Sequence, residues 1–186
     1  MAGVARAVTG GGGALTGECI KEASARSLII QLTNCRAATL SNPLVYLSKG
    51  QVLDPPPPTI PANEKAAFSF CKHDTLLEAV YGVMTYDVCD VYYIDGQKAL
   101  CRLAIMFSVP QDRVSYKNEF GIGVISPETP CDEKLLQAMY SGSHTNFKRQ
   151  VANGCQLKFS RKRPVLGTMS QTSHATMKVE IYNDEK

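Results

Sequence analysis

The amino-acid sequence predicts an all-β protein, a β-sandwich of about ten to twelve short strands flanked by one N-terminal helix and one helix in the C-terminal half. Short runs rich in β-branched and aromatic residues recur along the chain, and turn-forming residues separate them. Helical spacing of apolar residues is found in two segments, residues 14–25 and 130–140. Many short strands with one or two peripheral helices are typical of a sandwich of packed sheets.

The N-terminal segment differs in composition from the rest of the chain. Residues 10–13 are four consecutive glycines, which cannot hold a helix. Residues 14–25 place Leu15 and Ile20 on one side and charged residues on the other, but a helix of about 12 residues is marginal unless it docks. We therefore expect residues 1–25 to be a flexible segment with a short amphipathic helix, and residues 26–186 to form a single β-sandwich domain.

Turn chemistry separates the predicted strands. Asp95-Gly96 is a hairpin dipeptide, and the four prolines at 55–58 make a rigid connector that cannot join a central ladder. Pro110 ends the strand over 99–109 because it has no N–H to donate, so a surface loop follows. The predicted strands are residues 27–33, 43–48, 66–71, 78–86, 91–94, 99–109, 120–125, 156–159 and 175–182.

One amphipathic helix is predicted after residue 129. Pro130, Asp132 and Glu133 suit its first turn. Apolar side chains then recur at spacings of three and four, at Leu135, Leu136, Met139 and Tyr140.

Charge and cysteine content exclude several classes of protein. The net charge of +3 is mildly basic, and the excess is local to residues 158–163, which suit either a solvated connection or an anionic surface. No nucleic-acid motif accompanies this run. The seven cysteines have neither Cys-x-x-Cys spacing nor histidines at ligand spacing, which argues against a zinc site and against a complete disulfide framework. A reducing compartment fits them best, and we expect no metal and no cofactor.

The chain shows no membrane span and no secretory signal. No window reaches the roughly 18 to 20 apolar residues of a transmembrane helix. Glycines interrupt the weakly apolar start, so a continuous apolar signal region is missing. Any membrane role therefore starts from a water-soluble fold.

The residues around the 99–109 strand resemble a known family. The strand ends in Ser108-Val109-Pro110, Tyr116 follows in the loop, and Tyr140 lies in the predicted helix. With this pattern, residues 99–125 together with 130–140 resemble the actinoporins, small pore-forming cytolysins that recognise phosphocholine headgroups, chiefly of sphingomyelin. The resemblance extends over about residues 26–182 and is densest over 99–116.

The resemblance implies a headgroup site. Ser108 and Pro110 match the pocket serine and proline of the family, Tyr116 matches its loop tyrosine, and Tyr140 matches one of its helix tyrosines. Tyr81 falls where the family usually has a valine, and its ring would add a wall to an aromatic cage. A quaternary ammonium cannot donate hydrogen bonds, so aromatic faces hold it by cation–π attraction while hydroxyls and a basic residue address the phosphate.

The sequence departs from the family at the membrane-facing positions. Leu136 and Ser141 stand where the family has tyrosines, and Lys49 stands at a pocket serine. Ser115 and Glu119-Phe120 replace a tryptophan-rich cluster, and the chain contains no tryptophan. Because aromatic side chains favour the membrane–water interface, the loss of these tryptophans should weaken docking to the membrane. The candidate membrane contacts are Arg26, Lys49, Ser115 and Phe120.

The resemblance also implies insertion of an N-terminal helix, for which Leu15 and Ile20 are the candidate inserting residues. Crossing roughly 30 Å of hydrocarbon takes about 20 helical residues, so residues 14–25 are too short alone. Residues 1–25 would suffice only if all became helical in lipid.

These observations favour one function and leave alternatives. The leading interpretation is a pore-forming protein that binds phosphocholine-type, sphingomyelin-like lipid, self-associates on the membrane and permeabilises it to ions, causing cytolysis or hemolysis. The alternative is a non-lytic module of the same fold that binds a lipid headgroup or a glycan, and a third is an oligomeric structural protein with a decayed pocket. The family implies a secreted protein that acts on a target-cell membrane, whereas the odd cysteine count and missing signal favour the cytosol.

Catalysis is not expected. No Gly-x-Ser-x-Gly elbow surrounds Ser108, and His73, His144 and His174 lie in ordinary polar contexts. We therefore predict that the protein is not an enzyme.

Overall fold

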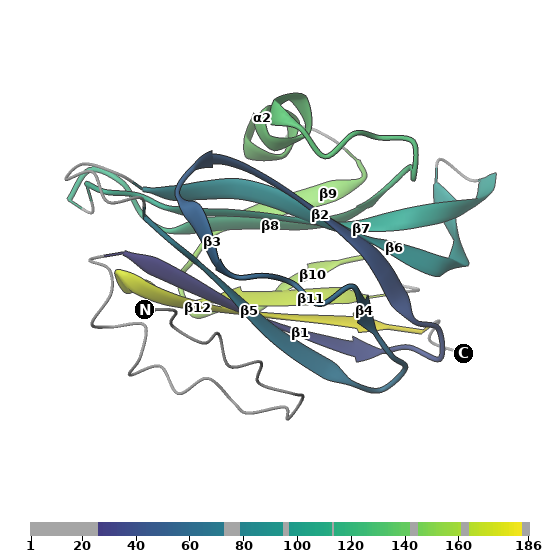
Figure 1. Cartoon of the computed structure of the whole chain (residues 1–186). Helices are drawn as coiled ribbons and strands as arrows, with labels where there is room; N and C mark the ends of the chain where they lie inside the picture. The colour runs from purple at the N-terminus through teal and green to yellow at the C-terminus, as the bar shows by residue number, and fades with distance from the viewer. Residues whose placement is uncertain are drawn as a thin grey trace, which may run out of the picture.

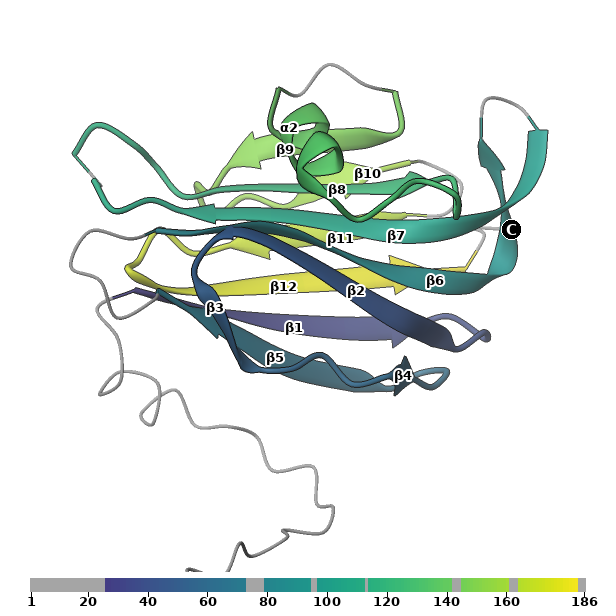
Figure 2. The same cartoon turned by 45° about the horizontal axis from the view of Figure 1, so that its top comes forward.

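In the computed structural model, the described residues form two β-sheets that pack face to face, and a helix lies on the outside of one of them (Figures 1 and 2). The structure describes residues 26–72, 79–94, 97–112, 114–141, 145–160 and 164–183, with only the backbone over 89–99. Leu15, Ile20 and the predicted helix over 14–25 lie outside the described residues.

Each sheet of the described residues has six strands. The first runs in the order β10 (Leu157–Phe159), β11 (Val165–Met169), β12 (His174–Tyr182), β1 (Ser27–Cys35), β5 (Lys65–Cys71) and β3 (Gln51–Asp54). The second runs in the order β4 (Thr59–Ile60), β2 (Leu40–Lys49), β6 (Val80–Ile94), β7 (Gln97–Val109), β8 (Glu119–Ile125) and β9 (Phe147–Val151). Neighbouring strands are antiparallel except for β1 and β12, which pair in parallel from Ser27 with His174 to Cys35 with Tyr182.

Strand alternation gives the second sheet two apolar faces. Along β7, Leu103, Ile105 and Phe107 point into the core between the sheets, while Ala104 and Met106 point outward. Phe70 of the first sheet stacks on Phe107 with ring centroids 4.8 Å apart, so aromatic packing joins the two sheets. The outward face must bury its apolar side chains elsewhere, and this requirement places the helix.

The helix α2 (Glu133–Ser141) covers the outward face of the second sheet. Asp132 caps it, because its carboxylate accepts a 3.0 Å hydrogen bond from the Leu135 N–H. Leu135, Leu136 and Met139 are buried against Val83, Ala104 and Met106. This apolar stripe at spacings of three and four fixes the angle at which α2 lies on the sheet.

The sandwich and the helix agree with the sequence prediction, and the structure extends it. The helix begins after its cap at Asp132, so Pro130 precedes the helix and is not in its first turn. The tetraproline connects β3 to β4, and the Tyr86 hydroxyl donates to the Pro57 carbonyl at 2.6 Å. The strand predicted over 43–48 begins earlier, at Leu40, because a register shift with Asn42 at a φ of 50° accommodates Pro43.

Four short strands are absent from the prediction: β3, β4, β9 and β11. They have five residues or fewer, and β9 alternates poorly because Lys148, Arg149 and Gln150 are consecutive. Residues 95–96, predicted as a hairpin dipeptide, lie outside the described residues, and Ile94 pairs with Gln97 across β6 and β7.

Candidate functional site

The site lies at the end of the second sheet where β7 stops. Tyr81 pairs with Ser108 across β6 and β7, and with Lys49 across β6 and β2. These three residues therefore form one row across the sheet. Tyr81 and Ser108 continue the outward faces of Val83 and Met106, beyond the apolar patch that α2 covers.

Two consecutive residues of β2 reach this row. A register shift between Leu47 and Lys49 interrupts the pairing of β2 with β6. A β-bulge of this kind turns a side chain that would otherwise point away. Ser48 and Lys49 both face the same space as a result, and both are exposed.

Distant parts of the chain hold the start of the loop after β7. The Arg26 guanidinium donates from Nε to the Pro110 carbonyl at 3.0 Å and from Nη2 to the Gln111 carbonyl at 2.5 Å. Arg26 immediately precedes β1, so the first sheet fixes the loop of the second. Arg26 was predicted as a membrane contact. In the structure its guanidinium is hydrogen-bonded to the loop and positions it.

A compact turn forms the tip of this loop. The Asp112 carboxylate accepts hydrogen bonds from the Val114 N–H at 2.9 Å and the Ser115 N–H at 3.1 Å. The Ser115 side chain, followed by these two N–H groups, lowers the pKa of Asp112. The carboxylate is thus ionised at neutral pH and engaged by its own loop, while Tyr116 projects from the tip with 61% of its surface exposed.

Asn118 anchors the far end of the loop. Its side-chain amide donates to the Ser170 and Thr172 carbonyls, both at 2.9 Å, in the turn between β11 and β12. The Asn118 carbonyl accepts from the Ala152 N–H at 2.8 Å. Asn118 is fully buried, so these bonds replace water and fix where Tyr116 stands.

Two tyrosines meet at the helix side of the site. The rings of Tyr81 and Tyr140 are 5.4 Å apart at an interplanar angle of 74°, an edge-to-face contact. The Arg149 guanidinium lies 5.1 Å from the Tyr140 ring centre, and it forms an ion pair with Glu119 at 3.0 Å. One side of the Tyr140 ring is therefore supported from β9.

The Tyr81 hydroxyl stays protonated well beyond neutral pH. Burial raises the pKa of Tyr81 to about 12, and the neighbouring Tyr140 and Glu119 add to the rise while Arg149 opposes it. The hydroxyl is therefore a neutral hydrogen-bond donor at physiological pH.

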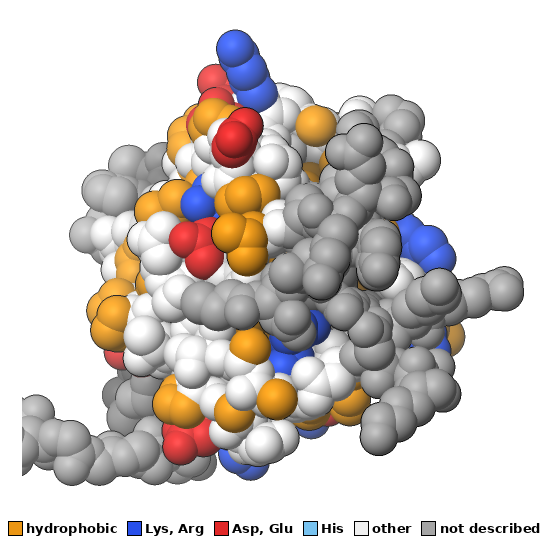
Figure 3. Space-filling view, turned by 90° about the vertical axis from the view of Figure 1, so that its right-hand side faces the viewer, with side chains coloured by type: hydrophobic (Ala, Val, Ile, Leu, Met, Phe, Trp, Pro, Cys, Tyr) orange, Lys and Arg blue, Asp and Glu red, His pale blue; other side chains and the backbone are white. Residues whose placement is uncertain are grey.

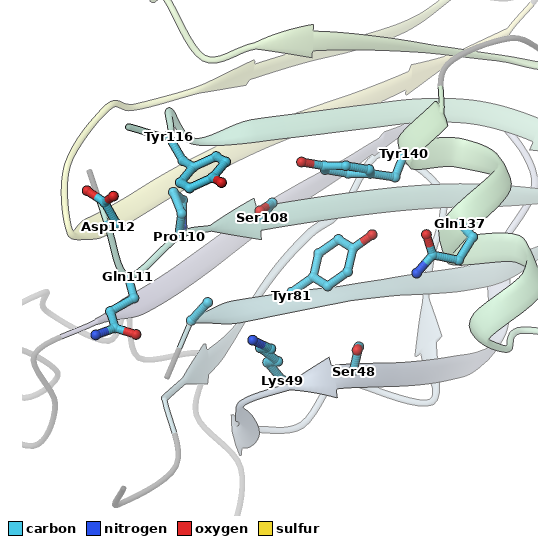
Figure 4. A pocket seen from close by; sticks show the side chains of 11 residues that line it. Ser48, Lys49, Tyr81, Ser108, Pro110, Gln111, Asp112, Tyr116, Gln137 and Tyr140 are labelled. Atoms are coloured by element: carbon cyan, nitrogen blue, oxygen red, sulfur yellow. The ribbon is translucent and has the colours of Figure 1, made fainter. Parts of the chain in front are cut away.

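These elements enclose a pocket of about 480 Å³ (Figure 4). All five residues predicted for the headgroup site line it: Tyr81, Ser108, Pro110, Tyr116 and Tyr140. Lys49, predicted as a membrane contact, lines it as well. Five further lining residues were not predicted from the sequence: Ser48, Ala79, Gln111, Asp112 and Gln137. For Gln137 a signal existed, since it lies three residues before Tyr140 on one helix.

The other predicted membrane contacts do not join the pocket lining. Ser115 is exposed on the loop tip beside Val114, which is 95% exposed. Phe120 is fully buried, and the prediction that it contacts the membrane was wrong. Because β8 begins at Glu119, alternation turns the Phe120 side chain into the core. There its ring lies against Gly167 of β11, so closely that a Cβ atom at position 167 would be 3.0 Å from it.

The described part of the chain contains no group of three or more His, Cys, Asp or Glu residues arranged to hold a metal ion. Among its helices, none has the length and apolar character needed to cross a bilayer.

The opposite end of the sandwich has a different surface. Figure 3 shows hydrophobic side chains there in separate small groups among polar and charged ones. Leu100, 59% exposed near the β6–β7 hairpin, lies far along β7 from Ser108.

Comparison with known proteins finds similarity both in sequence and in structure. No protein-family model matches the chain. Bryoporin from Physcomitrium patens is 29% identical over 160 residues, which are 84% of this chain and 83% of that protein. The crystal structure of the lipid-binding protein Nakanori superposes with a TM-score of 0.64 at 12% identity, covering 88% of this chain and 74% of that chain. The structural likeness shows a shared fold.

Proposed function

We propose that this protein is an actinoporin-like membrane-binding protein whose pocket holds a phosphocholine-type lipid headgroup. The observation that carries the proposal is the convergence of Tyr81, Tyr116 and Tyr140 on one pocket together with Ser108 and Pro110. The similarity to Bryoporin over most of both chains and the fold shared with a lipid-binding protein support binding to a membrane lipid, and the choice of headgroup rests on the pocket.

The chemistry of the pocket suits a quaternary ammonium. Its positive charge is spread over methyl groups, so it gains from aromatic faces and loses little by leaving water. Arg149 already occupies a position over the Tyr140 ring, which leaves the pocket side of that ring, together with Tyr81 and Tyr116, for the ligand. Tyr116 stands at the exposed rim, where one edge of its ring stays in water.

Vesicle sedimentation tests the headgroup proposal. The protein should co-sediment with vesicles that contain phosphatidylcholine or sphingomyelin, whereas much less of it should co-sediment with phosphatidylglycerol vesicles. Tyr116→Ala should weaken binding roughly three- to tenfold, and Tyr116→Phe should retain it because the ring remains. Leu100→Ala is the matched control, since it removes an exposed apolar side chain at the other end of the sandwich. Equal sedimentation with all vesicles, or no effect of Tyr116→Ala, would contradict the proposal.

The proposal extends to permeabilisation. After headgroup binding, protomers would self-associate on the membrane of a target cell, which a secreted protein would reach, and residues 1–25 would enter the bilayer. A continuous helix over this segment has about the length needed to cross the hydrocarbon layer. Calcein release from sphingomyelin-containing vesicles should therefore be lost on deletion of residues 1–25, while vesicle sedimentation is retained. Intact vesicles with the full chain at micromolar concentration would contradict lysis and leave a non-lytic headgroup-binding module.

A further inference from the structure

The row of outward-facing residues that carries the pocket continues beyond it. Ser108 pairs with Glu119 across β7 and β8, and Glu119 pairs with Val151 across β8 and β9. Phe120 points into the core, so alternation directs Glu119 to the outward face of the sheet. The Glu119 carboxylate is therefore next to the pocket on the side away from β2, although it is not among the lining residues.

Glu119 holds a cation against the Tyr140 ring. Its Oε2 atom lies 3.0 Å from Nη1 of Arg149, which comes from the neighbouring strand β9. The side chains of Arg149 and Glu119 are 34% and 19% exposed, so water and salt screen this pair only in part. The Arg149 guanidinium lies 5.1 Å from the centre of the Tyr140 ring. Tyr140 lines the pocket and Arg149 does not, so the guanidinium lies on the side of the ring that faces away from the pocket.

The charges of the ion pair act on the pocket as well as on each other. Burial is the main reason that the pKa of Tyr81 is raised to about 12, and the neighbouring Tyr140 adds to the rise. Glu119 raises this pKa further, whereas Arg149 lowers it. The Tyr81 hydroxyl points into the region between its own ring and that of Tyr140 (Figure 4). Charges that act on this hydroxyl also act on a cationic ligand held against the same rings.

A cation on each face of one ring creates a conflict. Each cation is attracted by the ring, but the two repel each other across it. The planar guanidinium of Arg149 supports the Tyr140 ring, and its positive charge would oppose a quaternary ammonium on the pocket side. The Glu119 carboxylate offsets this charge, because the ion pair as a whole is neutral.

We propose that the ion pair of Glu119 and Arg149 sets the preference of the pocket for a cationic ligand. Arg149 is a positioning residue that holds the Tyr140 ring, and Glu119 is a specificity-determining residue that cancels the charge of Arg149. This inference rests on the proposed function and deepens it. Binding of a quaternary ammonium should depend on Glu119, whereas binding of a neutral ligand of the same shape should not.

Choline and its neutral isostere 3,3-dimethylbutan-1-ol separate charge from shape. The quaternary nitrogen of choline is a carbon in the isostere, so the ratio of the two affinities measures the electrostatic part of binding. We would titrate the full chain with each ligand and follow tyrosine fluorescence, which no tryptophan obscures. Glu119→Gln should weaken choline about three- to fivefold and the isostere less than about twofold, because Arg149 loses its counter-charge. Rising salt should reduce this difference.

Arg149→Gln should change the ratio in the opposite direction. Without the guanidinium the Tyr140 ring loses its support, so both ligands should bind more weakly. The Glu119 carboxylate is then unpaired, so choline should lose less than the isostere and the affinity ratio should rise at least about twofold. The double variant, Glu119→Gln with Arg149→Gln, should return the ratio to within about twofold of the wild type. A purely structural role of the pair would leave the ratio unchanged in all three variants.

Two matched controls remove the same charges elsewhere. Glu128→Gln removes an exposed carboxylate beyond the other end of β8. Lys148→Gln removes an exposed cation next to Arg149, where Nζ donates to the Lys158 carbonyl on the side of β9 that faces β10. Both variants should keep the affinity ratio of the wild type. Urea unfolding curves would show that every variant is folded, as expected for side chains that are not fully buried.

The outcomes are distinguishable. Equal weakening of choline and the isostere in Glu119→Gln, or the same change of the ratio in Glu128→Gln, overturns the role of the ion pair while the headgroup proposal stands. Failure of the wild type to bind choline overturns both. Phosphatidylcholine vesicles should displace choline, which ties the soluble ligand to the lipid headgroup, and no displacement by them would contradict the proposed function.

Discussion

The two walls of the pocket are held in place by different forces. The loop wall, which carries Pro110 and Tyr116, is fixed at both ends by hydrogen bonds. Arg26 donates to the Pro110 carbonyl at its start, and Asn118 at its end donates to the Ser170 carbonyl of the first sheet's β11–β12 turn. The helix wall, which carries Gln137 and Tyr140, is fixed by burial of apolar side chains against the outer face of the sheet.

This difference has consequences for specificity and for stability. Hydrogen bonds are directional, so they can hold an irregular loop in one conformation that hydrophobic packing alone would leave undefined. Burial of an apolar stripe contributes more free energy than a few hydrogen bonds do, and it orients a whole helix. It does not fix individual polar groups. The loop wall should therefore respond to loss of single polar groups, and the helix wall to loss of volume.

Leu136→Ala gives the largest expected effect and tests the helix wall. Leu136 is fully buried beneath α2, so its truncation removes buried area and leaves a cavity. We expect the free energy of unfolding to fall by about 2–5 kcal/mol, measured by urea denaturation. Lys134→Ala on the exposed face of the same helix should change it by less than about 0.5 kcal/mol. Similar losses in the two variants would show that packing does not hold this wall.

Asn118 provides the corresponding test of the loop wall, with a smaller effect. Asn118→Ala leaves the Ser170 and Thr172 carbonyls without their donor and should cost about 1–3 kcal/mol in urea denaturation. Asn118→Asp keeps the shape but directs a carboxylate at two carbonyl oxygens, so it should be worse at neutral pH and recover on acidification. A pH-independent Asn118→Asp variant as stable as the wild type would contradict the assigned hydrogen bonds.

The site was predictable where the resemblance to the actinoporins named its residues. The structure adds why Ser108 and Tyr81 lie together, because the two residues are paired across β7 and β6 and both face outward. Ser48 matches no residue that the resemblance named, and the bulge before Lys49 breaks the period of two on which a prediction from alternation would rest. The wrong prediction for Phe120 has a related cause, because the face of the sheet on which its side chain lies depends on the residue at which β8 begins.

The fold was predictable in its long strands and incomplete in its short ones. The strands near 27–33, 66–71, 99–109 and 175–182 are rich in β-branched, aromatic and other apolar residues and lie in the structure within two residues of the predicted bounds. By contrast, β4 has two residues and is defined by its pairing with Leu40 and Ser41 of β2, a contact that no local pattern contains. Short edge strands of this kind exist only once the neighbouring strand is in place.

The smallest expected effect concerns the point where the two walls meet, at Tyr81. Its pKa is about 12 in the folded protein against 10.0 for an ordinary tyrosine, so between these values the unfolded chain loses a proton that the folded protein keeps. Stability should therefore fall as pH rises through this window. Tyr81→Phe removes the ionisable group and should make the fall shallower in urea denaturation series, whereas Tyr116→Phe, at an exposed ring, should not. Equal slopes for the wild type and Tyr81→Phe would show that the helix and loop walls do not shield this hydroxyl from water.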